Sequence, residues 1–186
     1  ILSGLVGSEM CIRDSCRARE WVMTSTAQTG LGVPSLEWVM SIQVAIATED
    51  RLGVCTDGQR SNYRILGGHF QGLEVRGEVV AGGADFYLQR SDGVGELDAR
   101  YSLLSDRGEW INIHNTGLIV LSDTGRELQA QGIWPIPEHQ YRCSCSPRFQ
   151  VASGRLAWLT RSVMIGKVSY PCLLYTSPSP RDQRGS

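Results

Sequence analysis

Glu96, Asp98 and Arg100 alternate with apolar side chains over a short stretch of the chain. Successive side chains of a β-strand point to opposite faces, so the three charged groups would share one face. If that face points into a barrel, Asp98 and Arg100 hold opposite charges at low dielectric, where they act strongly on a ligand. If it points outward, the same residues form a solvated surface. The sequence leaves both orientations open.

His114 lies on the next predicted strand and is the best candidate for a general base, because imidazole titrates near neutrality. A two- or four-residue turn between the strands would pair Asp98 with Asn115, whereas a three-residue loop would put His114 opposite Asp98. A slip of one residue moves every side chain to the other face, so the sequence does not decide the register. We predict Asp98 and His114 as a catalytic pair. The alternative for His114 is an ordinary hydrogen-bonded histidine.

Other polar and aromatic residues are candidates for binding a ligand beside this pair. The predicted ligand-binding residues are Arg76, Asp85, Arg100, Tyr101, Asn115, Tyr141 and Trp158. Asp85 follows a Gly-Gly pair, and its alternative role is to cap its own turn by hydrogen bonding to the backbone. An aromatic residue such as Trp158 is more often part of the core than a ligand platform.

Cys143 and Cys145 lie two residues apart and share a face if they belong to a strand. A tetrahedral metal site needs about two further ligands, and the sequence has no second such pair. We therefore interpret both cysteines as half-buried small hydrophobes and predict neither a metal nor a cofactor. The sequence also lacks a phosphate loop, a nucleotide-binding fingerprint and a GxSxG motif, which argues against kinase, hydrolase and nicotinamide-dependent functions.

Short alternating runs separated by glycine-rich turns indicate consecutive antiparallel strands. The predicted strands lie at residues 36–47, 64–66, 69–80, 85–90, 95–104, 109–121, 139–146 and 156–166. Residues 48–63 are polar and are predicted as a loop, and residues 124–131 as a short helix. This order predicts an all-β antiparallel barrel, closed or nearly closed, or a tightly curved sandwich, with one helix.

The composition limits the partners that we expect. The chain has 18 Lys plus Arg and 19 Asp plus Glu, so no excess of charge would attract nucleic acid or an anionic membrane. No stretch approaches the ~20 apolar residues that span a bilayer, and the first residues do not form a secretion signal. We predict a cytoplasmic protein with a small-molecule ligand, compatible with a homo-oligomer.

The two ends differ in composition from the rest of the chain. Residues 1–22 are predicted as a non-native or disordered leader and residues 171–186 as a non-native disordered tail, because both resemble translated sequencing-adapter sequence. Residues 23–170 are predicted as a single barrel domain whose C-terminal strand is truncated.

Six segments follow one another in the order and spacing of a known family. They are GGHFQG (67–72), RGEVVAGGADF (76–86), DGVGELDARYSL (92–103), NTGL (115–118), YRCSCSPRF (141–149) and AWLTRSV (157–163). Over residues 37–168 the chain resembles the family called domain of unknown function 3237. The resemblance implies an antiparallel barrel of the lipocalin or allene-oxide-cyclase type, which can enclose one small ligand. Thr160 stands where the family usually has Asn.

The sequence favours a barrel that binds a small organic molecule in an internal pocket. One alternative is a cofactor-free isomerase, cyclase or lyase that uses an acid–base pair in the barrel. A second alternative is a non-enzymatic interaction module built on an exposed sheet edge.

Overall fold

A computed structural model describes residues 6–11 and 36–170, the first of these ranges as backbone only. Most of the predicted leader and the whole predicted tail therefore lie outside the described residues. The elements in chain order are β1 (Val6–Cys11), β2 (Met40–Ile46), β3 (Asp50–Cys55), β4 (Gly58–Gly72), β5 (Arg76–Gln89), β6 (Val94–Ser105), β7 (Trp110–Leu121), α1 (Asp123–Ala130), η1 (Glu138–Gln140), β8 (Tyr141–Val151), η2 (Ala157–Thr160) and β9 (Gly166–Ser169).

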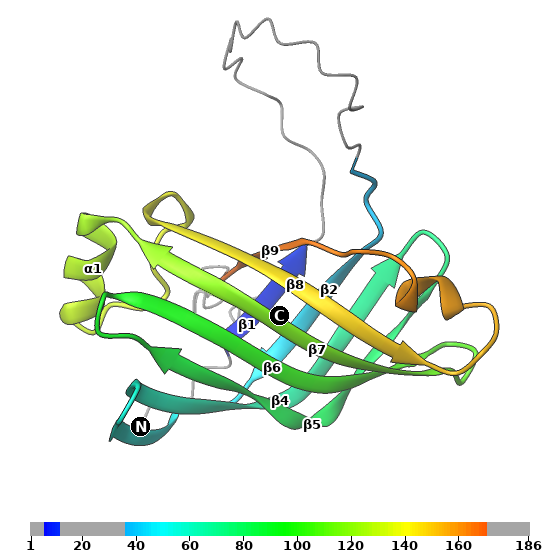
Figure 1. Cartoon of the computed structure of the whole chain (residues 1–186), viewed down its shortest axis with the longest axis horizontal. Coiled ribbons are helices and arrows are strands. Elements are labelled where there is room, and N and C mark those ends of the chain that lie inside the picture. The colour runs from blue at the N-terminus through cyan, green and yellow to red at the C-terminus, as the bar shows by residue number, and fades with distance from the viewer. Residues whose placement is uncertain (1–5, 12–35, 171–186) are drawn as a thin grey trace, which may run out of the picture.

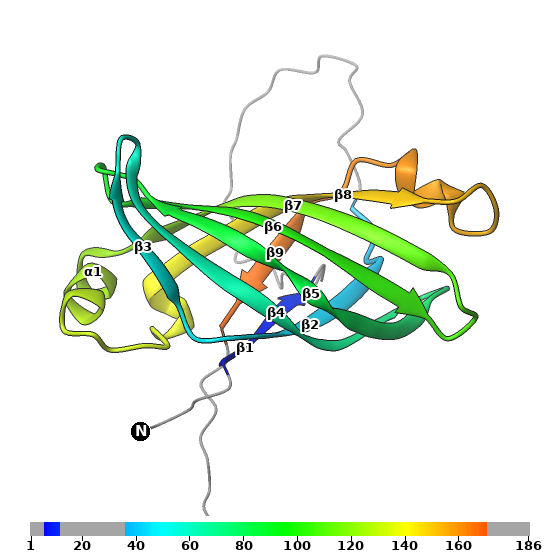
Figure 2. The same cartoon turned by 90° about the horizontal axis from the view of Figure 1, so that it is seen from below.

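The strands form one antiparallel sheet that curls into a half-barrel, with α1 at one end and η2 at the other (Figures 1 and 2). The strand order is β2-β1-β9-β8-β7-β6-β5-β4-β3, and β2 also pairs with β4. The all-β antiparallel class and the single α-helix of the described residues confirm the prediction from sequence. Ser122 caps α1, since its hydroxyl accepts a hydrogen bond from the Gly125 amide at 3.0 Å.

The central strands show the predicted alternation of buried and exposed side chains. In β6 the side chains of Leu97, Ala99, Tyr101 and Leu103 are buried, while those between them are more exposed. The period of two places the apolar set on the inner face of the sheet.

The β6–β7 loop consists of the three residues 106–108, and Gly108 takes the left-handed conformation that such loops require. In the resulting register Ala99 pairs with Asn115, and Arg100 pairs with His114. Asp98 pairs with Thr116, so neither of the two registers considered above is formed, although His114 does lie on the face of Asp98. His114 nevertheless lies opposite Arg100 and only diagonal to Asp98.

Four predictions of local structure were wrong. The strand predicted at 69–80 is divided by a turn at residues 73–75, since β4 ends at Gly72 and β5 begins at Arg76. The Gly67-Gly68 and Gly82-Gly83 pairs are bulges inside the long strands β4 and β5, because two glycines with positive φ suit a bulge as well as a turn. Residues 48–63 contain β3 and the start of β4. β3 is exposed and, among the described strands, pairs with β4 alone, so it needs no apolar alternation. Residues 157–160 form the 3₁₀-helix η2 instead of a strand, and its Leu159 is buried.

The interior has two different ends. At the η2 end, which we call the packed end, apolar side chains with at most 2 % exposure fill the space. They include Met40, Ile42, Phe70, Leu103, Ile111 and Leu159. At the α1 end, which we call the cavity end, the same inner face surrounds a hollow.

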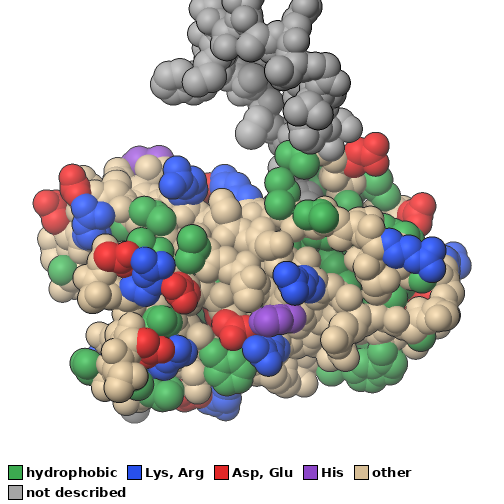
Figure 3. Space-filling model, in the orientation of Figure 1, with side chains coloured by type: hydrophobic (Ala, Val, Ile, Leu, Met, Phe, Trp, Pro, Cys, Tyr) green, Lys and Arg blue, Asp and Glu red, His purple; other side chains and the backbone are tan. Residues whose placement is uncertain are grey.

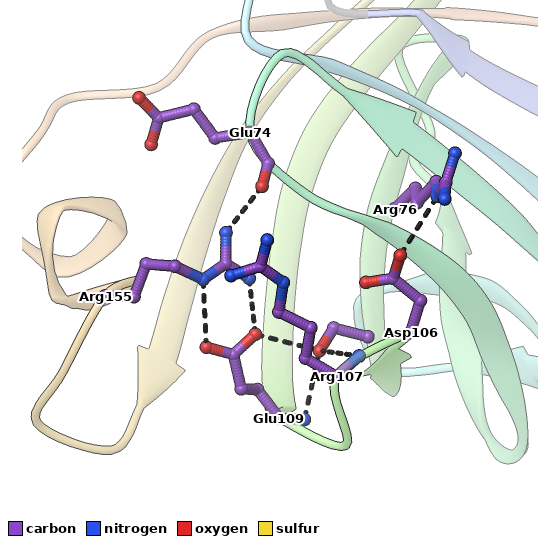
Figure 4. A network of polar contacts seen from close by, with 7 residues as sticks. Glu74, Arg76, Asp106, Arg107, Glu109 and Arg155 are labelled. Atoms are coloured by element: carbon purple, nitrogen blue, oxygen red, sulfur yellow. Dashed lines mark hydrogen bonds and ion pairs between the residues drawn. The ribbon is translucent and has the colours of Figure 1, made fainter.

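Polar contacts tie the loops together outside the packed end (Figure 4). The Arg155 guanidinium pairs with the Glu109 carboxylate at 2.5 Å and donates to the Glu74 carbonyl oxygen at 2.5 Å. Nearby, Arg76 Nε lies 3.0 Å from Asp106 Oδ2. These contacts join the β4–β5 turn, the β6–β7 loop and the segment after β8.

Candidate functional site

The hollow at the cavity end has a volume of about 640 Å³. Inward side chains of β2 and of β4 to β7 line it, together with Val168 of β9, Tyr170, Gln129 of α1 and Trp134. Apolar side chains such as Ile65, Leu97 and Ile119 make up much of the wall, and a few polar groups interrupt them. This combination is typical of pockets for small organic molecules.

One row of paired residues crosses the wall of the cavity. Tyr63 of β4 pairs with Asp85 of β5, Asp85 with Ala99 of β6, and Ala99 with Asn115 of β7. Cross-strand partners point to the same face of a sheet, so all four side chains face the cavity. Because Ala99 is small, space remains between the carboxylate of Asp85 and the amide of Asn115.

Asp85 is the central polar group of the cavity. The backbone amide of Asp98 donates a hydrogen bond to its Oδ1 at 2.8 Å, so Asp85 bonds to the neighbouring strand and does not cap its own turn. Burial raises the pKa of Asp85 to about 6, with a smaller contribution from the negative charge of Asp98, although the bond from the amide opposes the shift. Among the described residues, no Lys, Arg or His forms an ion pair with this carboxylate.

Four tyrosines share the cavity with Asp85. They are Tyr63, Tyr87, Tyr101 and Tyr170. Burial raises the pKa of Tyr63 to about 12 and raises the pKa of each of the others, and the charge of Asp85 adds to the rise in all four. The hydroxyl of Tyr87 donates to Gln89 Oε1 at 2.6 Å, and the rings of Tyr63 and Tyr87 meet edge to face, with centroids 6.2 Å apart. The phenols therefore stay neutral at physiological pH.

Glu49, Arg51 and Ser61 form a separate polar group in the lining. Arg51 Nη2 lies 2.9 Å from Glu49 Oε2, and the Ser61 hydroxyl donates to the other oxygen of Glu49. The hydrogen bonds from Arg51 and Ser61 hold the pKa of Glu49 below its ordinary value, against a smaller effect of burial. The charges of Glu49 and Arg51 thus compensate each other.

The predicted pair Asp98 and His114 lies on the outer face of the sheet, together with Arg100. His114 Nε2 is 2.7 Å from Asp98 Oδ1, and Arg100 Nε is 3.3 Å from the same oxygen. The three side chains are 40–60 % exposed. Figure 3 shows a histidine between acidic and basic side chains on this face. Burial raises the pKa of Asp98, but hydrogen bonds from Arg100 and His114 outweigh it and leave the pKa below its ordinary value.

The other predicted binding residues lie in three places. Asp85, Tyr101 and Asn115 line the cavity. Tyr141 does not line the cavity. Its hydroxyl accepts a hydrogen bond at 2.8 Å from the backbone amide of Tyr170, and Tyr170 is part of the lining. Arg76 and Trp158 lie at the packed end, Arg76 in its ion pair with Asp106 and Trp158 in η2.

Sequence reasoning missed Tyr63, Tyr87, Tyr170 and Glu49 as part of the lining. The signal for Tyr87 was available, because Asp85, Tyr87 and Gln89 alternate along β5 and therefore share one face. Glu49 and Tyr63 fell in the segment predicted as a loop, so their direction was not predictable.

Cys143 and Cys145 are free, buried and on the same face of β8. Burial raises the pKa of the Cys143 thiol to about 12 and that of the Cys145 thiol to about 11. No group of three or more His, Cys, Asp or Glu side chains with the spacing of a metal site occurs within residues 36–170. In the same part of the chain, no helix is long and apolar enough to cross a membrane.

Comparison with known sequences gives one family and relatives without an assigned function. The model of the family described as "Protein of unknown function (DUF3237)" matches residues 34–170. A UPF0311 protein from Clostridium acetobutylicum is 31% identical over 108 residues, which are 58% of this chain and 68% of that protein. One from Rhodopseudomonas palustris is 27% identical over 139 residues, which are 73% of this chain and 90% of that protein.

Solved structures of similar proteins share the fold. A protein of unknown function from Clostridium acetobutylicum superposes with a TM-score of 0.65 and 27% identity, over 72% of this chain and 97% of that chain. A conserved protein of unknown function from Rhodopseudomonas palustris superposes with a TM-score of 0.64 and 27% identity, over 73% of this chain and 95% of that chain. A protein from Acinetobacter baumannii described as β-barrel like superposes with a TM-score of 0.58 and 26% identity, over 74% of this chain and 96% of that chain.

Proposed function

This chain belongs to the DUF3237 family of proteins of unknown function, and we propose that it binds a small organic molecule in the cavity at its α1 end. The observation that carries the proposal is the contrast between the two ends of one interior. The packed end is filled with apolar side chains, whereas the cavity end leaves about 640 Å³ beside a carboxylate and several tyrosines. Leaving such a space empty costs packing energy, and a bound ligand would recover it.

We further propose that the sheet closes into a barrel around the ligand. The pairing of β2 with both β1 and β4 supports closure, since it links the two sides of the curled sheet. A closed wall would exclude water from Asp85 and Asn115 and strengthen their polar contacts with a ligand.

A thermal-shift screen of purified protein tests the binding proposal. The probes are aromatic acids, ketones, phenols and amines at a concentration of 1 mM. A ligand present at ~100 times its Kd stabilises the folded state by about 2.7 kcal/mol, which raises the Tm of a chain of this size by about 5–11 °C. We expect at least one chemical class to produce a shift of this kind. A screen in which no class shifts the Tm contradicts the proposal.

The variant Ala99→Phe tests where such a ligand binds. Its ring would occupy the space between Asp85 and Asn115, so we expect the affinity for the active probe to fall by about 100-fold or more. Ser102→Phe adds the same bulk to the outer face of the same strand and should leave the affinity unchanged. Equal binding by both variants, measured by isothermal titration calorimetry, would assign the ligand to another site.

A second candidate function is catalysis of proton transfer by Asp85, without a cofactor. The observation that favours it is the pKa of about 6, at which a carboxyl group can both accept and return a proton near neutral pH. In ²H₂O, the enzyme would exchange the α-protons of a bound ketone about 100-fold faster than the Asp85→Asn variant does. NMR measures this rate directly, and equal rates in the two proteins would remove Asp85 as the base.

A further inference from the structure

We propose that the ligand is an organic cation, an amine or quaternary ammonium group on an apolar body, whose positive charge lies against Asp85. This inference rests on the proposed function and names the chemical class of the ligand. It is carried by two independent features of the cavity, its charge balance and its aromatic wall.

The charge balance leaves one carboxylate for the ligand to compensate. Within residues 36–170, the charged residues in the lining are Glu49, Arg51 and Asp85. Glu49 and Arg51 form an ion pair with each other, so the charge of Asp85 remains. None of the three histidines lines the cavity, and the side chain of Lys167 pairs with Glu138. A buried carboxylate is costly unless it is paired, and a ligand cation supplies the missing partner.

The aromatic wall suits a cation as well. Tyr63, Tyr87 and Tyr101 come from three strands and Tyr170 follows β9, yet the charge of Asp85 acts on all four hydroxyl groups. Tyr63 is the cross-strand partner of Asp85, Tyr87 lies two residues after Asp85 on β5, and all four tyrosines line the same cavity. The faces of aromatic rings attract organic cations, and cages of such rings bind quaternary ammonium groups. An anionic ligand would instead meet Asp85 with like charge.

Several groups face Asp85 from the elements around it and bear on its titration. They are Tyr63 on β4, Tyr87 on β5, Tyr101 and the backbone amide of Asp98 on β6, Asn115 on β7, Cys143 on β8 and Tyr170 after β9. The carboxylate of Asp98 lies on the outer face, and its negative charge acts on Asp85 from there. The phenols and the thiol are neutral between pH 5 and 8, since burial raises their pKa values. Over this range Asp85 is therefore the group whose charge changes among the described residues that line the cavity.

The experiment compares two probes of the same shape, the benzyltrimethylammonium ion and its uncharged isostere neopentylbenzene. Isothermal titration calorimetry with the full chain at pH 7.5 should give a Kd at least tenfold lower for the cation than for the isostere. At pH 5 most of Asp85 is protonated, and the affinity for the cation should fall about tenfold while that for the isostere stays constant. The charge of the probe itself does not change with pH.

Two variants separate the roles of charge and shape. Asp85→Asn keeps the size of the side chain and an oxygen for the Asp98 amide, and it should lose the preference for the cation and its pH dependence. Glu78→Gln removes an exposed carboxylate from the same strand and should behave like the unmodified protein. Circular dichroism verifies that both variants are folded.

The outcomes distinguish the two proposals. Binding of the isostere equal to or tighter than that of the cation overturns the inference about ligand class and leaves the cavity as a binding site. A preference for the cation that persists in Asp85→Asn also overturns it. If neither probe binds and no compound of the thermal screen shifts the Tm, the proposed function itself fails.

Discussion

The Asp85→Asn variant should be more stable than the unmodified protein by about 3 kcal/mol at pH 8. Burial raises the pKa of this carboxyl group to about 6, compared with 3.8 for an unperturbed group. The difference of about 2 pKa units corresponds to ~3 kcal/mol of penalty for carrying the charge in the cavity. Asparagine is uncharged and can still accept the hydrogen bond from the Asp98 amide.

The sign of the pH dependence follows from the raised pKa. Between pH 4 and 6 the folded protein holds a proton on Asp85 that the unfolded chain has largely released, so stability falls as pH rises. Above pH 6 both states are ionised and the stabilising contribution of the neutral form is lost. The difference between the variant and the unmodified protein should therefore be near zero at pH 4 and grow to its full size by pH 7.

Urea denaturation at pH 4, 6 and 8 measures this difference from the midpoint and the m-value. Glu78→Gln is the matched control, because its side chain is exposed on the same strand and should change stability by less than ~0.5 kcal/mol at every pH. A stability difference that is independent of pH would show that Asp85 titrates normally. Loss of stability in Asp85→Asn at pH 8 would mean that its charge is compensated in the folded protein.

A stabilising substitution at the centre of the cavity would carry a functional meaning. Natural proteins tolerate destabilised groups where binding or catalysis needs them. An uncompensated carboxylate that lowers the stability of the free protein, and that a ligand cation would stabilise, is a group of this kind. The stability measurement and the binding measurement therefore report on the same carboxylate by independent routes.

The strands with one buried face were predictable from the sequence, whereas the direction of the charged strand face was not. Alternation in β6 and β7 identifies which side chains share a face. It does not say which face is inward when charged groups such as Asp98 and Arg100 occupy one of them. The three-residue loop 106–108 fixes the register, and the apolar residues Leu97 and Leu103 fill the other face, so the charged groups point outward.

The candidate site was predictable only in part, for a related reason. Tyr101 and Asn115 lie on the inner face of strands with clear alternation, and both line the cavity. Tyr63 and Glu49 belong to exposed or irregular parts of β4 and its surroundings, where no pattern indicates a direction. Whether an interior is filled or hollow depends on side-chain volumes summed over several strands, and no local pattern contains that sum.

The two ends of the interior should respond differently to the same substitution in one strand. Leu103 and Leu97 both lie on the inner face of β6, with 0 % and 6 % exposure. Leu103 belongs to the packed end, whereas Leu97 lines the cavity. Truncating a leucine in a packed core costs the transfer free energy of the lost atoms plus a term for the new cavity, ~3–5 kcal/mol in total. We expect this full cost for Leu103→Ala.

Leu97→Ala enlarges a hollow that already exists, so it loses fewer packing contacts, and we expect about half the cost, ~1–2.5 kcal/mol. Leu118→Ala on the outer face of β7 is the surface control and should change stability by less than ~0.5 kcal/mol. Urea denaturation of the three variants at one pH gives the comparison. Equal losses for Leu97→Ala and Leu103→Ala would mean that the α1 end is packed as tightly as the η2 end in solution, and the cavity on which the proposed binding depends would then be absent.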